Sequence, residues 1–170
     1  LVYNIDGSVY FTDSRPDPAN GSTSIYRLPR TQLPEASPLQ RVSEECEMPR
    51  GVALGPKQNR LYITDAARRV VRVQAIQPDG SLASGRIFAQ FASAAPGRPD
   101  GLKTDERGDV FATGPEGIWI FAADGAHLGT IVTPEQPTNC CWGRGFRGLY
   151  ITAETSVYYV ETRVSGTRTF

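Results

Sequence analysis

The chain has 170 residues, enough for one domain with a hydrophobic core, and its 18 basic and 18 acidic residues give a formal net charge of zero. This balance excludes the basic stripe that nucleic-acid binding requires, and no apolar run approaches the roughly 18 residues that span a bilayer. We therefore expect neither nucleic acid nor a membrane as a partner.

Short runs rich in Val, Ile, Tyr, Phe and Thr follow one another along the whole chain, separated by turns that contain Gly and Pro. Such runs predict β-strands, and since no long helical period interrupts them we expect almost no helix. The first group reads VYFTD, SIYRL and LQRVSEE, and the second reads RGVAL, LYITD, RVVRV and GRIFAQF. The third group reads DGLKT, VFATG, GIWIF and HLGTIVT, and the last reads NCCWG, LYITA and SVYYV.

One strand with an aromatic residue recurs in every group, about 40 to 50 residues apart. A period of this length with four strands per repeat is typical of the blades of a β-propeller. We predict an all-β fold, a β-propeller of four-stranded antiparallel blades, in a single domain over residues 1–170. The aromatic residues are Tyr10, Tyr62, Phe111 and Tyr150, and the blades are expected at about 1–45, 46–95, 96–136 and 137–170.

The first and last of these about four blades are incomplete in the sequence pattern. Propellers have ~4 to 8 blades, and a closed ring usually completes its last blade with a strand from the other terminus. The first residues already belong to the first blade and cannot easily supply that strand. We expect either part of a larger ring whose amino-terminal blades are missing here, or a homodimer that completes the ring.

Three polar residues occupy equivalent positions at the start of the innermost strands. Arg50, Asp100 and Asn139 each lie about 11 residues before the aromatic residue of the next strand. The innermost strands of a propeller line its central channel, so we expect these side chains to converge. They are either channel-lining groups solvated by water or a site built from one residue per blade. The equivalent position of the first repeat would precede Leu1.

Four stretches carry a resemblance to a known family, and in order they are DGSVYFTDS, MPRGVALGPKQNRLYITDA, GRPDGLKTDERGDVFATGPEGIWIFAADGAHLGTIVTPEQPTNCCWG and LYITAETSVYYV. Together they resemble the carboxyl-terminal part of the gluconolactonase/regucalcin-like family, also called the senescence marker protein family. The Pro-Asp-Gly stretch and the Gly-x-Val-x-x-Thr-Gly after it are the most specific part. The resemblance implies a six-bladed propeller that hydrolyses sugar lactones and holds one divalent cation, often calcium, in its channel.

The resemblance also implies roles for individual residues. The family's metal ligands are a Glu from the first blade, two Asn and one Asp. Asp100 matches the Asp of Pro-Asp-Gly, which implies a metal ligand and a general base. Arg50 stands where the family has the Asn of Pro-Asn-Gly, and Asn139 matches a channel-lining position. The other Asn would precede Leu1, and the Glu would lie further upstream.

Arg50 changes the chemistry that the family pattern implies. A guanidinium group only donates hydrogen bonds and stays charged. A unit charge about 5 Å from a divalent ion costs roughly 6 kcal/mol at an effective dielectric near 20. Three arrangements follow: Arg50 turns out of the channel, the chain holds calcium poorly, or Arg50 pairs with Asp100 and binds a carboxylate or phosphate bidentately.

Two functions are consistent with these residues. The first is a metal-dependent lactonase that hydrolyses a small sugar or related lactone, with Asp100 and Arg50 as catalytic residues and Arg50 and Asn139 as substrate-binding residues. Its cofactor would be a divalent cation, calcium by resemblance, with Asp100 as a ligand. The alternative is a non-catalytic or degenerate propeller that binds a small anionic ligand and is completed by self-association.

The three cysteines give an expectation for the cellular compartment of the protein. Their number is odd and no Cys-x-x-Cys spacing occurs, so a disulfide framework and a zinc site are both disfavoured. The first residues also show no signal-peptide pattern. These features favour a cytoplasmic location.

Overall fold

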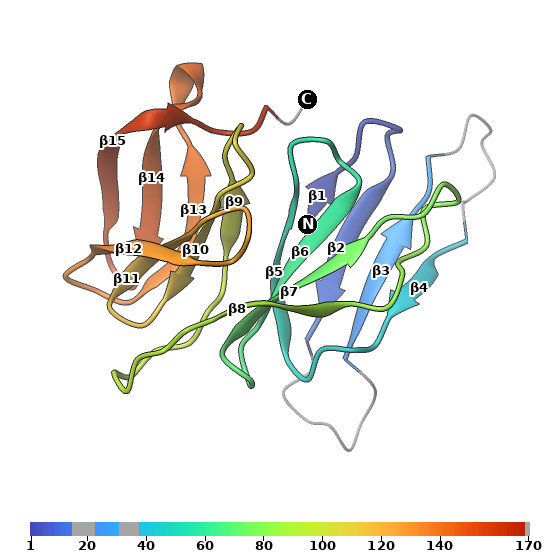
Figure 1. Cartoon of the computed structure of the whole chain (residues 1–170), viewed down its shortest axis with the longest axis horizontal. Helices are drawn as coiled ribbons and strands as arrows, with labels where there is room; N and C mark the ends of the chain where they lie inside the picture. The colour runs from blue at the N-terminus through green and yellow to red at the C-terminus, as the bar shows by residue number, and fades with distance from the viewer. Residues whose placement is uncertain (15–22, 31–37, 169–170) are drawn as a thin grey trace.

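The computed structural model describes residues 1–14, 23–30 and 38–168. These residues form four antiparallel sheets (Figure 1), and their helical content is one 3₁₀ turn, η2 (Arg144–Phe146). The prediction of an all-β chain of four-stranded antiparallel units is confirmed. No helix in the described ranges is long and apolar enough to cross a membrane.

Each sheet is built from strands that are consecutive in the chain. The first sheet contains β1 (Val2–Tyr3), β2 (Val9–Asp13), β3 (Ser24–Leu28) and β4 (Gln40–Ser43). The second contains β5 (Pro49–Leu54), β6 (Arg60–Asp65), β7 (Val70–Ala75) and β8 (Arg86–Gln90). The third contains β9 (Leu102–Thr104), β10 (Val110–Gly114), β11 (Gly117–Phe121) and β12 (His127–Val132). The fourth contains β13 (Pro137–Trp142), β14 (Arg147–Ala153) and β15 (Val157–Ser165).

The first strand of every sheet lies against the first strand of the next. β5 contacts β1 on one side and β9 on the other, and β9 contacts β13. In Figure 1, β5 and β9 lie in the middle of the molecule, whereas β4 and β15 lie at opposite sides. The sheets are therefore arranged side by side around their innermost strands, as in a β-propeller.

Three apolar clusters hold neighbouring sheets together. Tyr10 and Ile63 are fully buried between the first and second sheets, and Leu102 and Phe121 are buried between the second and third. The third and fourth sheets meet at a cluster around Leu149. Because the middle sheets are covered on both faces, strands such as β6 and β10 are buried along nearly their whole length.

A threonine at the same place in the first two repeats joins its sheet to the next one. The hydroxyl of Thr64, which is fully buried, accepts a hydrogen bond from the Gly51 amide (2.8 Å) and donates one to the carbonyl oxygen of Asp100 in the next sheet (2.5 Å). Thr12 likewise donates to the carbonyl oxygen of Arg50 in the sheet that follows its own (2.5 Å). The inner strands therefore depend on hydroxyl groups from the preceding sheet for their positions.

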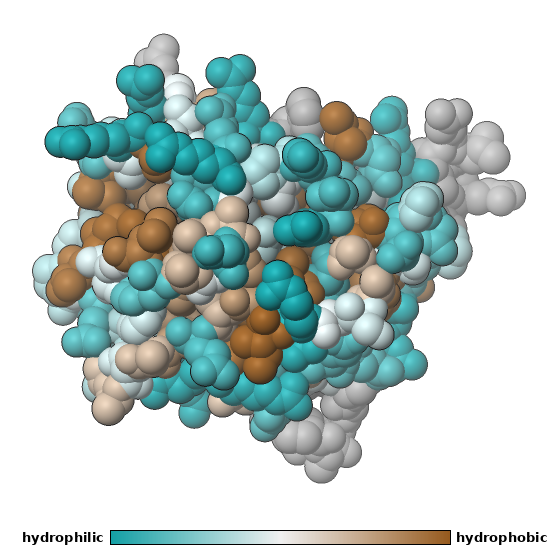
Figure 2. All heavy atoms as spheres, viewed as in Figure 1, coloured by the Kyte–Doolittle hydropathy of each residue, from teal (hydrophilic) through white to brown (hydrophobic). Residues whose placement is uncertain are grey.

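The last sheet differs from the others in having three strands in the described part of the chain. The outer edge of β15 has no partner strand within residues 1–14, 23–30 and 38–168. A groove of about 520 Å³ lies between the third and fourth sheets, lined by residues of both sheets that include Phe111, Leu128 and Val160. Figure 2 shows apolar side chains gathered on the side of the molecule that carries the fourth sheet. Leu128 in β12 and Val157 in β15 are exposed.

We expect Thr64→Val to lower the free energy of unfolding of the full-length protein by about 1 to 3 kcal/mol, because it removes the buried hydroxyl that links the Gly51 amide to the carbonyl oxygen of Asp100 and leaves only their direct 3.2 Å bond. The matched control is Thr152→Val at the equivalent place in the fourth repeat, where the threonine is exposed and its hydroxyl donates to Asn139 within one sheet (3.3 Å). Urea denaturation measures both variants. Equal losses in the two would contradict the bridging role of Thr64.

Candidate functional site

The starting ends of the inner strands are linked directly to one another. The Gly51 amide donates to the carbonyl oxygen of Asp100 (3.2 Å), and the Gly101 amide donates to the carbonyl oxygen of Thr138 (3.0 Å). These bonds run from the second sheet to the third and from the third to the fourth. Positions 50, 100 and 139, which the sequence predicts to be equivalent, therefore occur in neighbouring places at one end of the inner strands.

Glycine after Arg50 and after Asp100 has a steric reason. A Cβ atom on Gly51 would collide with the carbonyl oxygen of Asp100, and one on Gly101 would collide with the side chain of Asn139. The backbones of successive sheets thus approach each other too closely for any larger residue. The glycine of the Asp-Gly pair lets the fourth sheet place Asn139 beside Asp100.

The backbone of Asp100 is fully used, whereas its side chain is not. Its amide donates to the hydroxyl of Thr113 (2.9 Å), and its carbonyl oxygen accepts from Gly51 and Thr64. For this reason β9 starts at Leu102 rather than at Asp100, the start that the sequence suggested. The carboxylate forms no hydrogen bond with any described residue and is half-buried.

Burial is the main influence on the charge of this carboxylate. It raises the pKa of Asp100 above its ordinary value, and the positive charge of Arg50 acts in the opposite direction. By contrast, the carboxylate of Asp65 is fully buried and accepts the amides of Glu47 (2.9 Å) and Met48 (3.1 Å). Asp65 is engaged in building the fold, while Asp100 remains available to a ligand.

Arg50 does not pair directly with Asp100. Its side chain is exposed, and its Nη2 lies 3.9 Å from the sulfur atom of Met48. No ion pair within 4 Å joins Arg50 to Asp100 among the described side chains, although the charge of Arg50 still influences the pKa of Asp100. The guanidinium group therefore lies against Met48, and the direct ion pair with Asp100 is not formed.

Asn139 is exposed beside Gly101. Its Oδ1 accepts a hydrogen bond from the amide of Cys140 (2.8 Å). That bond fixes the orientation of the amide group, and its Nδ2 has no partner among the described residues. Asn139 can therefore donate a hydrogen bond to a ligand that lies near Asp100.

The cavity between the inner strands lies further along the channel. It has a volume of about 230 Å³ and is lined by side chains that include Tyr3, Lys103, Cys141 and Trp142. None of Arg50, Asp100 and Asn139 lines it. The three predicted residues lie instead near the starting ends of β5, β9 and β13, a place that we call the channel mouth.

The channel mouth does not have the composition of a calcium site. A hard cation takes ~6 to 8 oxygen ligands, largely from carboxylates, amides and water. Among the described residues no cluster of three His, Cys, Asp or Glu side chains could hold a metal ion. Asp100 offers the one carboxylate, Asn139 already accepts a hydrogen bond, and Arg50 adds a positive charge. The described residues therefore do not fit a divalent cation on their own.

Sequence reasoning missed the residues that hold the channel mouth in shape. Asp65 fixes the backbone of Met48, and Met48 contacts the side chains of both Arg50 and Arg98. The sequence did contain a signal for the structural role of Asp65: VYFTD and LYITD both end in Asp directly after the bridging threonine. The contact of two arginines with one sulfur atom has no signature in the sequence.

Comparison with protein families gives one clear match. Residues 1–155 match the SMP-30/Gluconolactonase/LRE-like region. A gluconolactonase of Zymomonas mobilis is 33% identical over 183 residues, which cover 98% of this chain and 50% of that protein. The pentonolactonase XacC of Haloferax volcanii is 27% identical over 87% of this chain and 54% of that protein. The chain thus spans about half the length of these two relatives.

Solved structures show the same fold. A gluconolactonase from Xanthomonas campestris superposes with a TM-score of 0.80 at 30% identity, over 98% of this chain and 56% of that one. Regucalcin from Agrobacterium tumefaciens, a calcium-binding protein, superposes with a TM-score of 0.79 over 99% of this chain and 61% of that one. Its 15% identity supports the fold alone. The predicted resemblance and the propeller fold are both confirmed.

We expect Arg50→Met to raise the pKa of Asp100 further, because the substitution removes the positive charge that favours the ionised carboxylate. Titration of the Asp100 side-chain carboxyl by ¹³C NMR measures this pKa. Arg107→Met is the matched control, since Arg107 is exposed in the β9–β10 turn at the opposite end of the inner strands. An Asp100 pKa that is unchanged in Arg50→Met would show that the two groups do not interact.

Proposed function

The chain belongs to the SMP-30/gluconolactonase/LRE-like family, and we propose that it contributes the channel mouth of an enzyme that hydrolyses sugar or related lactones. The observation that carries this proposal is the place of the Asp100 carboxylate and its lack of hydrogen-bond partners among the described residues. The carboxylate lies at the meeting point of three sheets, forms no hydrogen bond with a described residue, and has a raised pKa. A carboxylate kept free in this way is a candidate general base.

Asp100 would remove a proton from the water molecule that attacks the lactone carbonyl. Burial favours this role, because it raises the pKa of Asp100 and so makes the ionised carboxylate a stronger base. The water oxygen bonds to the carbonyl carbon, negative charge develops on the carbonyl oxygen, and the ring C–O bond then breaks to give the hydroxy acid. The proton that Asp100 takes up can pass to the ring oxygen as that bond breaks.

Arg50 and Asn139 would assist from either side of Asp100. The positive charge of Arg50 can stabilise the oxyanion, and the Nδ2 of Asn139 can donate a hydrogen bond that orients the lactone. The family implies a divalent cation for this step. Asp100 is the one described side chain that matches its ligand set, so these roles are assigned to the chain's own groups.

A second candidate function is a propeller that binds a small anion without hydrolysing it. It is favoured by the guanidinium group of Arg50, which forms no ion pair with the described residues and stands at a position where the family pattern has a neutral side chain. Hydrolysis of any lactone that depends on Asp100 would exclude this candidate. The activity measurement below therefore decides between the two.

We expect Asp100→Asn to lower kcat/KM for glucono-1,5-lactone by about 10²- to 10⁴-fold in the full-length protein, the range for loss of a general base. Acid release is followed with a pH indicator. The folded state should be retained, because burial disfavours the charged form of Asp100: at pH values above its raised pKa the charge destabilises the fold, and asparagine removes it.

The control is Asp124→Asn, at an exposed aspartate whose carboxylate accepts the Ala126 amide in a turn (3.0 Å). This variant should keep the activity of the unsubstituted protein. A folded Asp100→Asn variant with undiminished activity would sink the assignment of the base. Failure of the unsubstituted protein to hydrolyse gluconolactone, pentonolactones or related lactones would sink the proposed function.

A further inference from the structure

Two arginines meet at the channel mouth. The Nη2 of Arg50 and the Nη1 of Arg98 each lie 3.9 Å from the sulfur atom of Met48. Arg50 comes from the start of β5, and Arg98 comes from the segment that leads into Asp100. Both guanidinium groups therefore contact a single thioether, and the charge of Arg50 acts on the proposed base, Asp100.

This pair of charges has no counter-ion in the described part of the chain. Neither Arg50 nor Arg98 forms an ion pair with a described carboxylate. Arginines elsewhere do find partners: Arg27 lies 3.2 Å from Asp6 and Arg72 lies 2.6 Å from Glu45. Placing two like charges together costs free energy, and an anion bound between them converts that cost into attraction.

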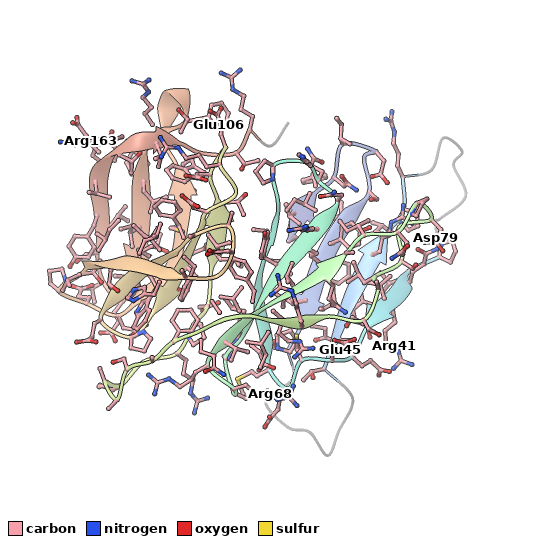
Figure 3. All side chains as sticks on the ribbon, viewed as in Figure 1. Arg41, Glu45, Arg68, Asp79, Glu106 and Arg163 are labelled. Carbon is pink, nitrogen blue, oxygen red and sulfur yellow. The ribbon has the colours of Figure 1, made fainter. Side chains whose placement is uncertain are left out.

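The fold holds the elements that carry the two arginines in place. The backbone amides of Glu47 and Met48 donate to the buried carboxylate of Asp65, which orients the segment just before Arg50. Figure 3 shows Arg68, whose guanidinium group lies 3.6 Å from Asp65, at the end of the molecule opposite Glu106. Arg98 is followed by the buried Pro99 and then by Asp100, whose backbone bonds to Thr113 and Thr64. The arginines are thus fixed at their backbones while their side chains stay exposed.

The neighbourhood also defines what the arginines can bind. A guanidinium fork matches the oxygen atoms of a carboxylate or phosphate and binds them bidentately. The carboxylate of Asp100 repels a second anion, so the ligand's charged group must lie on the far side of the arginines, over Met48. The neutral part of the ligand then extends toward Asp100 and Asn139.

We infer that Arg50 and Arg98 form a clamp for an anionic oxygen group carried by the ligand. This inference rests on the proposed function in its choice of substrate: the enzyme would prefer lactones of acidic or phosphorylated sugars over neutral lactones. A carboxylate and a phosphate share the required chemistry. The clamp also gives Arg98 a role, as a specificity residue, that the family pattern does not assign to it.

Calorimetry on the full-length protein tests the clamp without turnover. The probes are glucose, glucuronate and glucose 6-phosphate, which share one sugar ring and differ in the group at its sixth carbon. We expect glucuronate or glucose 6-phosphate to bind at least about 10-fold more tightly than glucose, a difference that higher salt reduces. The tighter of the two anionic sugars identifies the group that the clamp accepts.

Arg98→Met should remove this preference, and Arg98→Lys should restore part of it, since lysine keeps the charge but not the fork. Arg107→Met, the same change in the exposed β9–β10 turn, should leave binding as in the unsubstituted protein. Circular dichroism shows that each variant is folded. Equal binding of all three sugars, or undiminished preference in a folded Arg98→Met variant, would overturn the clamp.

The clamp and the proposed function fail separately. If lactones are hydrolysed but charged and neutral sugars bind alike, the clamp is wrong and the lactonase stands. If glucuronate or glucose 6-phosphate binds through Arg98 and no lactone is hydrolysed, the clamp stands as an anion site and the lactonase is wrong.

Discussion

The hydrogen bonds between successive inner strands are the constraint on which the rest of this molecule depends. A blade cannot bury both of its faces alone, so its position is set by its neighbours. Apolar packing supplies most of the free energy that holds neighbouring sheets together, but because it is non-directional it does not fix how one sheet is oriented against the next. The buried hydroxyl of Thr64 and the amide of Gly51, both bonded to the carbonyl oxygen of Asp100, add the direction that fixes one sheet against the next.

The same bonds explain why Asp100 is available for chemistry. Its backbone is held at three points, so its side chain is not needed for the fold. Asp65, by contrast, is engaged by backbone amides and serves the structure. Two aspartates from neighbouring sheets thus have different roles: Asp65 is fully buried with backbone amides as partners, whereas Asp100 is half-buried and its carboxylate has no such partners among the described residues.

The channel mouth carries the positive charges of two arginine side chains. Where the family pattern leads one to expect ligands for a cation, this chain places Arg50 and, across Met48, Arg98. Burial raises the pKa of Asp100, and the positive charge of Arg50 acts on that pKa in the opposite direction. The specificity proposal follows from this positive charge, whereas the proposed function rests on the carboxylate of Asp100.

The architecture could be predicted from the sequence because the repeat is regular: one aromatic strand per sheet marks the period, and runs of Val, Ile, Tyr, Phe and Thr between Gly- and Pro-containing turns mark the strands. The equivalence of Arg50, Asp100 and Asn139 follows from the same repeat. The path of the Arg50 side chain could not be predicted, because a long exposed side chain is directed by neighbours such as Met48 that come from irregular segments. The partner arginine, Arg98, lies in such a segment too and escaped notice for the same reason.

Native-state hydrogen exchange at the amides of Gly51 and Gly101 tests the central claim most directly. These two amides join the second sheet to the third and the third to the fourth. If the inner strands are tied as described, both amides exchange only with global unfolding, as slowly as core amides of β6 and β10. Exchange at the rate of exposed turns such as the one at Gly125 would show that the sheets are not joined there, and the channel mouth would lose its basis.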